Sequence, residues 1–530
     1  MKYLRFLLLL AWLCASVAGA ETTFTERWFY APTNLLVDKN VDTLEVLMRR
    51  AAKTQYTGLL LTDTKLGKLG DLGDMTARYL KNVERVKSLA GELKLEIIPS
   101  IFPLGYSESI LWHDPNLAEA LPVKDALFVV KGGEARLVPD VRPLKKFTWK
   151  DDNVALDGET WVASNPNGKN ARVVFKLKVR PFKQYHVSVK IKTQAFKGEP
   201  EVKVLADKAS LQYAGLGVKP TQDWTEHHAV FNSLEHEEIN LYFGCWGGQT
   251  GTLAWKDARF EEVGLLNVVR RPGAPLTVAR ETGEALTEGK DFERIADPRM
   301  GCVPWKGSYE VWHEPPVIKT SLPDGTRLKV SYYHAITVLN DQVMICPSEP
   351  KTLELLKDEA QRVHKAFGAK KYMMSFDEIR VFNQCEACRS RKLEAGPLLA
   401  GLARECVKIL RDVNPGGKIY VWSDMFDPNH NAHKDYYLVR GDLGGSWEGL
   451  DKDVCIVAWY FEARDKTFAF FSERGNPLLI AGYYDGGQDT RKWLESAKKS
   501  QGVMGIMYTT WQNKYDELEN FAKTVREFYP

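Results

Sequence analysis

The 530-residue chain carries 72 Lys and Arg against 69 Asp and Glu, a formal charge of +3, and 44% of its residues are apolar. This length exceeds one ordinary domain and the apolar content is typical of a globular protein, so we expect two domains. The nearly balanced charge gives no electrostatic case for a nucleic-acid or anionic-membrane partner.

The first twenty residues have the pattern of a secretory signal. Lys2 and Arg5 precede the apolar stretch 6–17, and Ala18-Gly19-Ala20 is a small-residue cleavage site. We expect cleavage near Ala20, which lowers the formal charge by two, from +3 to +1. No later apolar run reaches the ~20 residues that span a bilayer. The sequence therefore predicts an exported protein, periplasmic or extracellular, with no membrane span.

The remaining chain alternates strand and helix patterns in two blocks. Strands are predicted at 27–32, 58–63 and 95–101, with helices at 41–53 and 76–94 between them. After residue 350 the alternation resumes with strands at 371–377, 419–424, 454–459, 478–483 and 505–510, and helices at 397–413, 466–474, 490–500 and 515–528. Three strands and five strands make the eight of an α/β fold, a (β/α)8 TIM barrel.

A long excursion separates the two blocks. Residues 147–262 show alternating strands with turn residues and no helix, which predicts an inserted all-β sandwich. The barrel then comprises 21–146 and 263–530, and a ninth apolar run, 328–334, belongs to the excursion. Aromatic residues of the insert, such as Trp149, Trp161, Tyr242 and Trp255, fill the sandwich core or form a platform for stacking sugars.

Two adjacent carboxylates, Asp377 and Glu378, end the fourth predicted barrel strand, and Arg380 follows them. Barrel enzymes place catalytic residues at the carboxyl ends of strands. Neighbours on a regular strand point to opposite faces, so the pair serves one pocket only if the chain twists or bulges there. The other interpretation is a surface ion pair between Glu378 and Arg380. We predict a catalytic pair, with Arg380, His334 of the excursion and Asp424 after the fifth strand as binding residues.

Seven cysteines remain after the predicted cleavage, and Cys385 and Cys388 form a single CxxC pattern. A structural zinc site needs four ligands, and no second CxxC or HxxxH accompanies this one. The pattern therefore favours a local disulfide or buried thiols. Asp427, His430 and His433 also cluster after the fifth strand, but their spacing matches no standard metal site. We expect no metal and no cofactor.

With its elements counted in this way, the barrel resembles the glycoside hydrolase family 20 β-N-acetylhexosaminidases, in which an Asp-Glu pair ends the fourth strand. Trp422-Ser-Asp424, Trp459, Tyr483-Tyr-Asp485 and Trp511 are similar to that family's segments after strands five to eight. The insert resembles carbohydrate-binding modules. Departures mark a divergent relative: Met373–Phe376 replace the family's His-x-Gly-Gly, Asn34 lies near its missing arginine, and Asn513 replaces its glutamate.

The resemblance implies a substrate-assisted retaining hydrolysis. Glu378 is then the general acid, ionised Asp377 orients the substrate's acetamido group, and Tyr483 donates to the acetamido oxygen. The tryptophans wall the pocket, and Asn513 is a further binding residue. The partner is an oligosaccharide, polysaccharide or glycoconjugate. Two alternatives remain: a conventional retaining glycosidase that pairs Glu378 with a carboxylate such as Asp424 on a non-acetylated sugar, and a non-catalytic carbohydrate-binding surface protein.

Overall fold

The computed structural model describes residues 24–207, 209–339 and 341–530. The predicted signal segment, 1–20, lies outside these residues. The predicted (β/α)8 TIM barrel is confirmed, because eight parallel strands form one closed sheet in which β1 pairs with both β2 and β27. In order around the barrel the strands are β1 (Glu26–Pro32), β2 (Gly58–Thr62), β3 (Glu96–Ile101), β21 (Lys371–Met374), β23 (Lys418–Trp422), β25 (Cys455–Ala458), β26 (Leu478–Tyr483) and β27 (Val503–Thr509).

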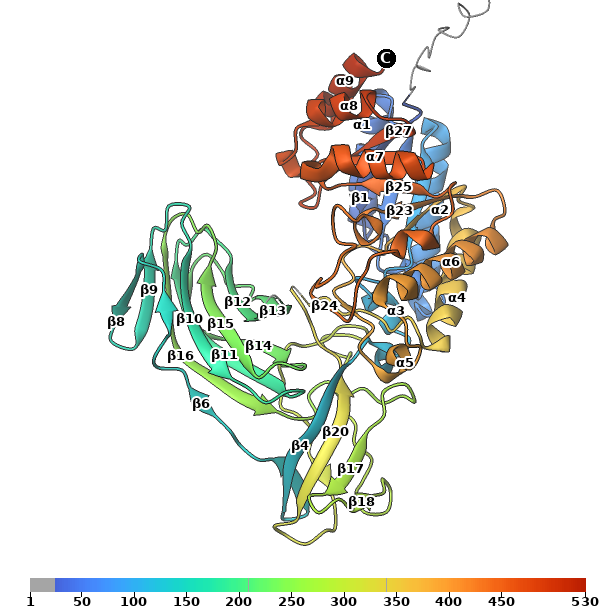
Figure 1. Ribbon diagram of the computed structural model, residues 1–530. Helices are drawn as coiled ribbons and strands as arrows, with labels where there is room; N and C mark the ends of the chain where they lie inside the picture. Colours follow the sequence, from blue (N-terminus) through green and yellow to red (C-terminus); the bar gives the residue numbers. More distant parts are fainter. Residues whose placement is uncertain (1–23, 208, 340) are drawn as a thin grey trace, which may run out of the picture.

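Amphipathic helices cover the outside of the barrel (Figure 1). They are α1 (Asp38–Lys53), α2 (Thr76–Leu93), α4 (Pro350–Phe367), α6 (Ala395–Val413), α7 (Arg464–Arg474), α8 (Thr490–Lys498) and α9 (Leu518–Phe528). In α1 the buried residues Val41, Leu44 and Met48 recur at helical spacing, so that one face packs on the strands. Between β23 and β25 the described chain has no α-helix but two short 3-10 turns and the strand β24 (Leu438–Val439), which pairs with β22 (Val381–Phe382), so a long loop lies at the carboxyl end of β23.

The barrel interior is filled at its amino end and open at its carboxyl end. Side chains from alternate strand positions, among them Trp28, Met373 and Tyr420, form a buried core inside the sheet. At the amino end of β21, the Lys371 ammonium lies 2.8 Å from Glu26 and 2.6 Å from Glu96. This buried ionic cluster occupies the amino end, so the space for a ligand lies at the opposite end.

The β-sandwich is present in the excursion between β3 and β21, on the left in Figure 1. One sheet contains β7 (Trp149–Lys150), β10 (Ala171–Lys178), β15 (Glu238–Cys245), β12 (Pro200–Ala206) and β13 (Ala209–Gly215). The other contains β14 (Gln222–Asn232), β11 (Gln184–Gln194), β16 (Thr252–Val263), β9 (Thr160–Ser164) and β8 (Val154–Asp157), with β6 (Arg142–Pro143) paired to β16. Trp161 and Trp255 are buried between the sheets, so these two aromatics are core residues.

A third, antiparallel sheet was not anticipated from the sequence. It consists of β18 (Ala285–Leu286), β17 (Thr277–Arg280), β20 (Arg327–His334), β4 (Leu121–Lys131), β5 (Glu134–Leu137) and β19 (Ile318–Lys319). The sequence pattern predicts that both flanks of the sandwich belong to the barrel. Instead β4 and β20, far apart in sequence, lie side by side below the barrel (Figure 1). The ninth apolar run is β20.

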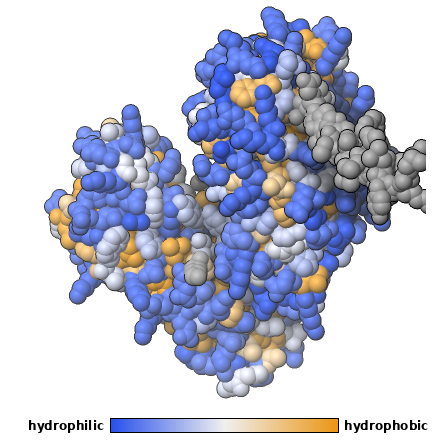
Figure 2. Space-filling model, turned by 45° about the horizontal axis from the view of Figure 1, so that its top comes forward, coloured by the Kyte–Doolittle hydropathy of each residue, from blue (hydrophilic) through white to orange (hydrophobic). Residues whose placement is uncertain are grey.

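The sandwich and the barrel form two lobes of a mostly hydrophilic surface (Figure 2). The loop after β20 contacts one edge of the sandwich, where the Leu339 backbone N–H donates to the carbonyl of Tyr213 on β13 at 2.8 Å. None of the helices in the described residues combines the length and the apolar content needed to cross a bilayer.

Candidate active site

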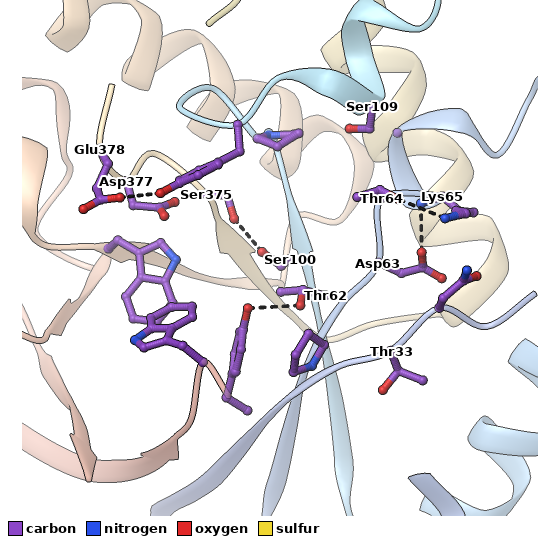
Figure 3. A pocket seen from close by; sticks show the side chains of 18 of the residues that line it. Thr33, Thr62, Asp63, Thr64, Lys65, Ser100, Ser109, Ser375, Asp377 and Glu378 are labelled. Atoms are coloured by element: carbon purple, nitrogen blue, oxygen red, sulfur yellow. Dashed lines mark hydrogen bonds between the residues drawn. The ribbon is translucent and has the colours of Figure 1, made fainter. Parts of the chain in front are cut away.

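A cavity of about 770 Å³ opens at the carboxyl ends of the barrel strands. This volume is within the range of small-molecule sites. Figure 3 shows Asp377 and Glu378 on one side of this pocket and Asp63, Thr64 and Lys65 on the other. Other lining residues are Tyr30, Asn34, Thr62, Ser100, Tyr106, Ser109, Glu359, Ser375, Trp422, Trp459, Tyr484 and Trp511. The pocket therefore contains both predicted catalytic carboxylates.

The chain leaves the regular strand geometry before it reaches the acid pair. Strand β21 ends at Met374, and Glu378 has a left-handed backbone with φ 50°. Gly105 allows the loop after β3 to approach this turn, since a Cβ at Gly105 would lie 1.9 Å from the Asp377 carbonyl oxygen. The turn is the deviation from a strand that two adjacent residues need in order to face one cavity.

Glu378 is held by a network of charged and polar partners. Its carboxylate lies 2.7 Å from the Arg380 guanidinium and accepts a hydrogen bond from the Tyr106 hydroxyl. Arg380 donates to Gln342 Oε1 at 2.5 Å, and Gln342 Nε2 donates to the Glu378 carbonyl at 2.9 Å. Arg380 is only 6% exposed and is not a lining residue of the pocket. It is a positioning residue for Glu378.

Asp424 supports the pair from behind. Its Oδ2 accepts hydrogen bonds from the Glu378 backbone N–H at 2.8 Å and from Asn431 at 3.0 Å, and its Oδ1 accepts one from Trp459 Nε1 at 3.3 Å. It is completely buried and is not a lining residue of the pocket. Asp424 therefore fixes the turn and Trp459, and the structure does not place it where substrate binds.

Burial and neighbouring negative charges raise the pKa values of two carboxyl groups in this cluster. Burial, with the charges of Asp424 and Glu378 nearby, raises the pKa of Asp377 from 3.8 to about 8. Burial also raises the pKa of Asp424 to about 6, although the hydrogen bond from the Glu378 backbone opposes the shift. The raised pKa favours the protonated form of Asp377 at neutral pH, whereas the resemblance implied an ionised Asp377. The Glu378 carboxylate is paired with the Arg380 guanidinium.

Aromatic side chains form part of the pocket wall. Trp422 and Trp511 lie 6.0 Å apart between ring centroids, and Trp511 packs on Tyr30 at 5.0 Å. Trp459 stacks on Tyr484 at 5.8 Å with the rings nearly parallel. All three predicted tryptophans line the cavity, and Trp511 remains 45% exposed. Such surfaces stack on the apolar faces of sugar rings and exclude water.

Three other predicted binding residues do not reach the cavity. Tyr483 stacks on Tyr508 with 4.2 Å between ring centroids. The backbone turns at Tyr483, with φ 73°, and Tyr484 instead of Tyr483 lines the pocket. Asn513 is exposed after β27 and is not a lining residue. His334 is fully buried, where Gln184 and Asn232 of the sandwich contact its ring at 3.0 and 2.9 Å. Burial lowers the pKa of His334 to about 4, so it is a neutral link between β20 and the sandwich.

Several pocket residues were missed by the sequence analysis. Asp63 follows β2 as the acid pair follows β21, so the same signal would have identified it. Tyr106 also lines the pocket, and its hydroxyl donates a hydrogen bond to Glu378. Ser100 and Ser375 share a hydrogen bond of 2.6 Å, which only the pairing of β3 with β21 brings about.

Two of the polar residues in the loop after β23 contact other protein groups. The Asp427 carboxylate accepts a hydrogen bond from Thr467 at 2.5 Å, and the His430 ring stacks on Tyr460 at 4.4 Å. In the described part of the chain, the group of side chains arranged to hold a metal ion lies elsewhere, at Glu119, Cys346, Cys385 and Cys388.

No protein-family model matches this chain, and the search of curated proteins found no match. Among solved structures, a β-N-acetylhexosaminidase from Bacteroides fragilis is similar over 95% of this chain and 65% of its own, with 10% identity and a TM-score of 0.38. A rhamnosidase from Novosphingobium sp. PP1Y is similar over 92% of this chain and 55% of its own, with 11% identity and a TM-score of 0.35. A family 4 carbohydrate-binding module is similar over 23% of this chain and 77% of its own, with 14% identity and a TM-score of 0.17. The chain thus spans less than two thirds of the length of the two enzymes.

Proposed function

We propose that the protein is an exported glycoside hydrolase that acts on a β-linked N-acetylhexosamine or a related sugar. The observation that carries the proposal is the placement of Asp377 and Glu378 in one aromatic-walled cavity with opposite electrostatic environments. Two carboxyl groups with different protonation states are what acid-assisted cleavage of a glycosidic bond requires at neutral pH.

The environments favour Asp377 as the proton donor. In the first step its carboxyl proton passes to the glycosidic oxygen, the bond to the anomeric carbon breaks, and the substrate's acetamido oxygen forms the new bond to that carbon. The Glu378 carboxylate, held by Arg380 and Tyr106, accepts a hydrogen bond from the acetamido N–H and stabilises the positive charge that develops. In the second step the Asp377 carboxylate takes a proton from water, which attacks the anomeric carbon and restores the acetamido group.

Support for a polymeric substrate comes from the outer face of the sandwich. Trp149, Val174, Tyr242, Lys203 and Tyr213 are direct cross-strand partners, so they form one row across β7, β10, β15, β12 and β13. The neighbouring positions on β10 and β15, which face the opposite side, pack in the core. The row ends at Tyr213, whose carbonyl contacts the loop that carries Gln342. It thus leads from the sandwich toward the active site.

The proposal is tested with purified protein and paired 4-nitrophenyl glycosides that differ only at the 2-position, the β-N-acetylglucosaminide and the β-glucoside. Loss of the internal nucleophile reduces rate more than affinity, so we expect the acetamido sugar to turn over at least about a hundredfold faster. A thiazoline analogue of the cyclised intermediate should inhibit.

The matched controls separate the alternatives. Glu473→Gln, an exposed carboxylate on α7, should leave turnover unchanged. Equal turnover of the two sugars with no thiazoline inhibition refutes acetamido assistance and favours a conventional carboxylate nucleophile. A folded protein that binds polysaccharide and cleaves none of a broad glycoside panel favours the non-catalytic alternative.

A further inference from the structure

Three cysteines and one glutamate from three distant parts of the chain converge in the buried region beneath the active-site loops. Glu119 precedes β4, Cys346 follows β20, and Cys385 and Cys388 flank the start of the short helix α5 (Glu386–Arg389). All four side chains are at most 1% exposed. Their candidate ligand atoms, three sulfurs and one carboxylate oxygen, lie within 4.8 Å of one another.

The spacing of these atoms fits one tetrahedral metal ion. Cys346 Sγ lies 3.4 Å from Cys385 Sγ and 3.7 Å from Cys388 Sγ, and Glu119 Oε2 lies 3.4 Å from both Cys385 Sγ and Cys388 Sγ. Zinc–sulfur bonds of about 2.3 Å in a tetrahedron separate two sulfurs by about 3.8 Å. A disulfide requires a sulfur separation of about 2.05 Å, so the observed distances are those of ligands around a centre.

The orientation of Glu119 is the second indication. Its Oε1 accepts hydrogen bonds from the backbone N–H groups of Gln384 and Cys385 at 2.7 and 2.8 Å, which fixes the carboxylate. The other oxygen, Oε2, is thereby aimed at the sulfurs. An ionised carboxylate beside thiols in a buried site is costly unless a cation balances it. Proteins orient a carboxylate ligand of a metal by hydrogen bonds to the oxygen that does not bind the metal, which here is Oε1.

We propose that Glu119, Cys346, Cys385 and Cys388 bind a structural Zn²⁺ ion. Three thiolates select a thiophilic ion, and the four protein ligands close the coordination sphere, which is typical of structural and not catalytic zinc. Arg271 lies at the edge of the site, where it donates to the Ala118 carbonyl at 3.0 Å, and its charge offsets part of the negative charge of the ligands.

The position of the site gives the ion a mechanical role. Glu119 and Cys346 bracket the excursion that contains the third sheet and the sandwich, and Cys385 and Cys388 lie in the segment that follows the acid pair. Zinc at this point ties the base of the excursion to the loop after β21. The loop that carries Gln342 ends at the same ligand, Cys346, so the ion also anchors the contact between Gln342 and Glu378.

The experiment measures zinc in the full-length purified protein by mass spectrometry of the metal and by colorimetric release with a thiol-blocking mercurial. We expect about one zinc per chain in the wild type and in the control Cys406→Ser, a buried cysteine of α6 outside the cluster. Cys346→Ser should retain far less than one. Glu119→Gln keeps the three thiols and should lower zinc affinity by about tenfold or more, measured by competition with a chelator.

If a variant fails to fold, a measurement on the wild type still tests the proposal. After removal of the metal with a chelator, added Co²⁺ should give the intense visible absorption of a tetrahedral thiolate site, and Zn²⁺ should abolish this absorption and raise the melting temperature. A folded, zinc-free wild type, a disulfide between any two of the three cysteines in the peptide map, or zinc content unchanged in both variants would overturn the proposal.

Discussion

Replacement of Asp377 by asparagine separates the cost of burying this carboxyl from its use in catalysis. Burial, together with the charges of Asp424 and Glu378, raises the pKa of Asp377 from 3.8 to about 8. This change makes the ionised form on the order of 5 kcal/mol less favourable in the folded protein than in the unfolded chain. Because part of the side chain faces the solvent of the pocket, this figure is an upper value.

The sign of the pH dependence follows from the raised pKa. The unfolded chain releases the Asp377 proton near pH 4, whereas the folded protein keeps it up to about pH 8. The folded state therefore binds more protons in this window, and its stability falls as the pH rises. Asparagine has no proton to lose, so the variant lacks this contribution. We expect Asp377→Asn to match the wild type near pH 4 and to exceed its stability by up to about 5 kcal/mol at pH 8.

The assay compares urea unfolding of the wild type, Asp377→Asn and the exposed-carboxylate control Glu473→Gln at several pH values between 4 and 8. Activity should move in the opposite direction, since loss of a general acid costs on the order of a hundredfold or more in kcat/KM. The wild-type kcat/KM should also fall on the basic side near pH 8. Parallel stability curves for wild type and Asp377→Asn would refute the raised pKa of Asp377. Retained activity in the variant would refute its role as the proton donor.

Two further predictions concern residues outside the pair. Gln342→Ala removes the hydrogen bonds to Arg380 and to the Glu378 carbonyl, so kcat should fall about tenfold with little change in KM. Steady-state kinetics against the exposed control Gln361→Ala measures this, and an unchanged kcat would show that Arg380 and Tyr106 position Glu378 without Gln342. Tyr242→Ala, in the middle of the sandwich row, should weaken binding to polysaccharide by about 1 kcal/mol or more and leave turnover of a small aryl glycoside intact. Affinity electrophoresis measures binding to the polysaccharide, and steady-state kinetics measures turnover of the aryl glycoside. Equal losses in both would place the row inside the active site.

The sequence by itself determined the fold class, because apolar periodicity is a local property. Strand and helix patterns recurred with the period of their element, and the switch to alternating strands at 147 marked the sandwich. The acid pair could also be found in this way, since a buried strand that ends in adjacent carboxylates is visible in a dozen residues. The same rule applied to β2 would have found Asp63.

The tertiary structure alone decided the roles of these residues, because a role depends on neighbours that are distant in sequence. The protonation of Asp377 depends on the burial and charge contributed by β23, through Asp424. Tyr484 and not Tyr483 faces the cavity because of a local left-handed turn that no residue type requires. Cys385 and Cys388 showed only half of a ligand set, since the other half, Glu119 and Cys346, is brought to them by the closure of the barrel around a long insertion.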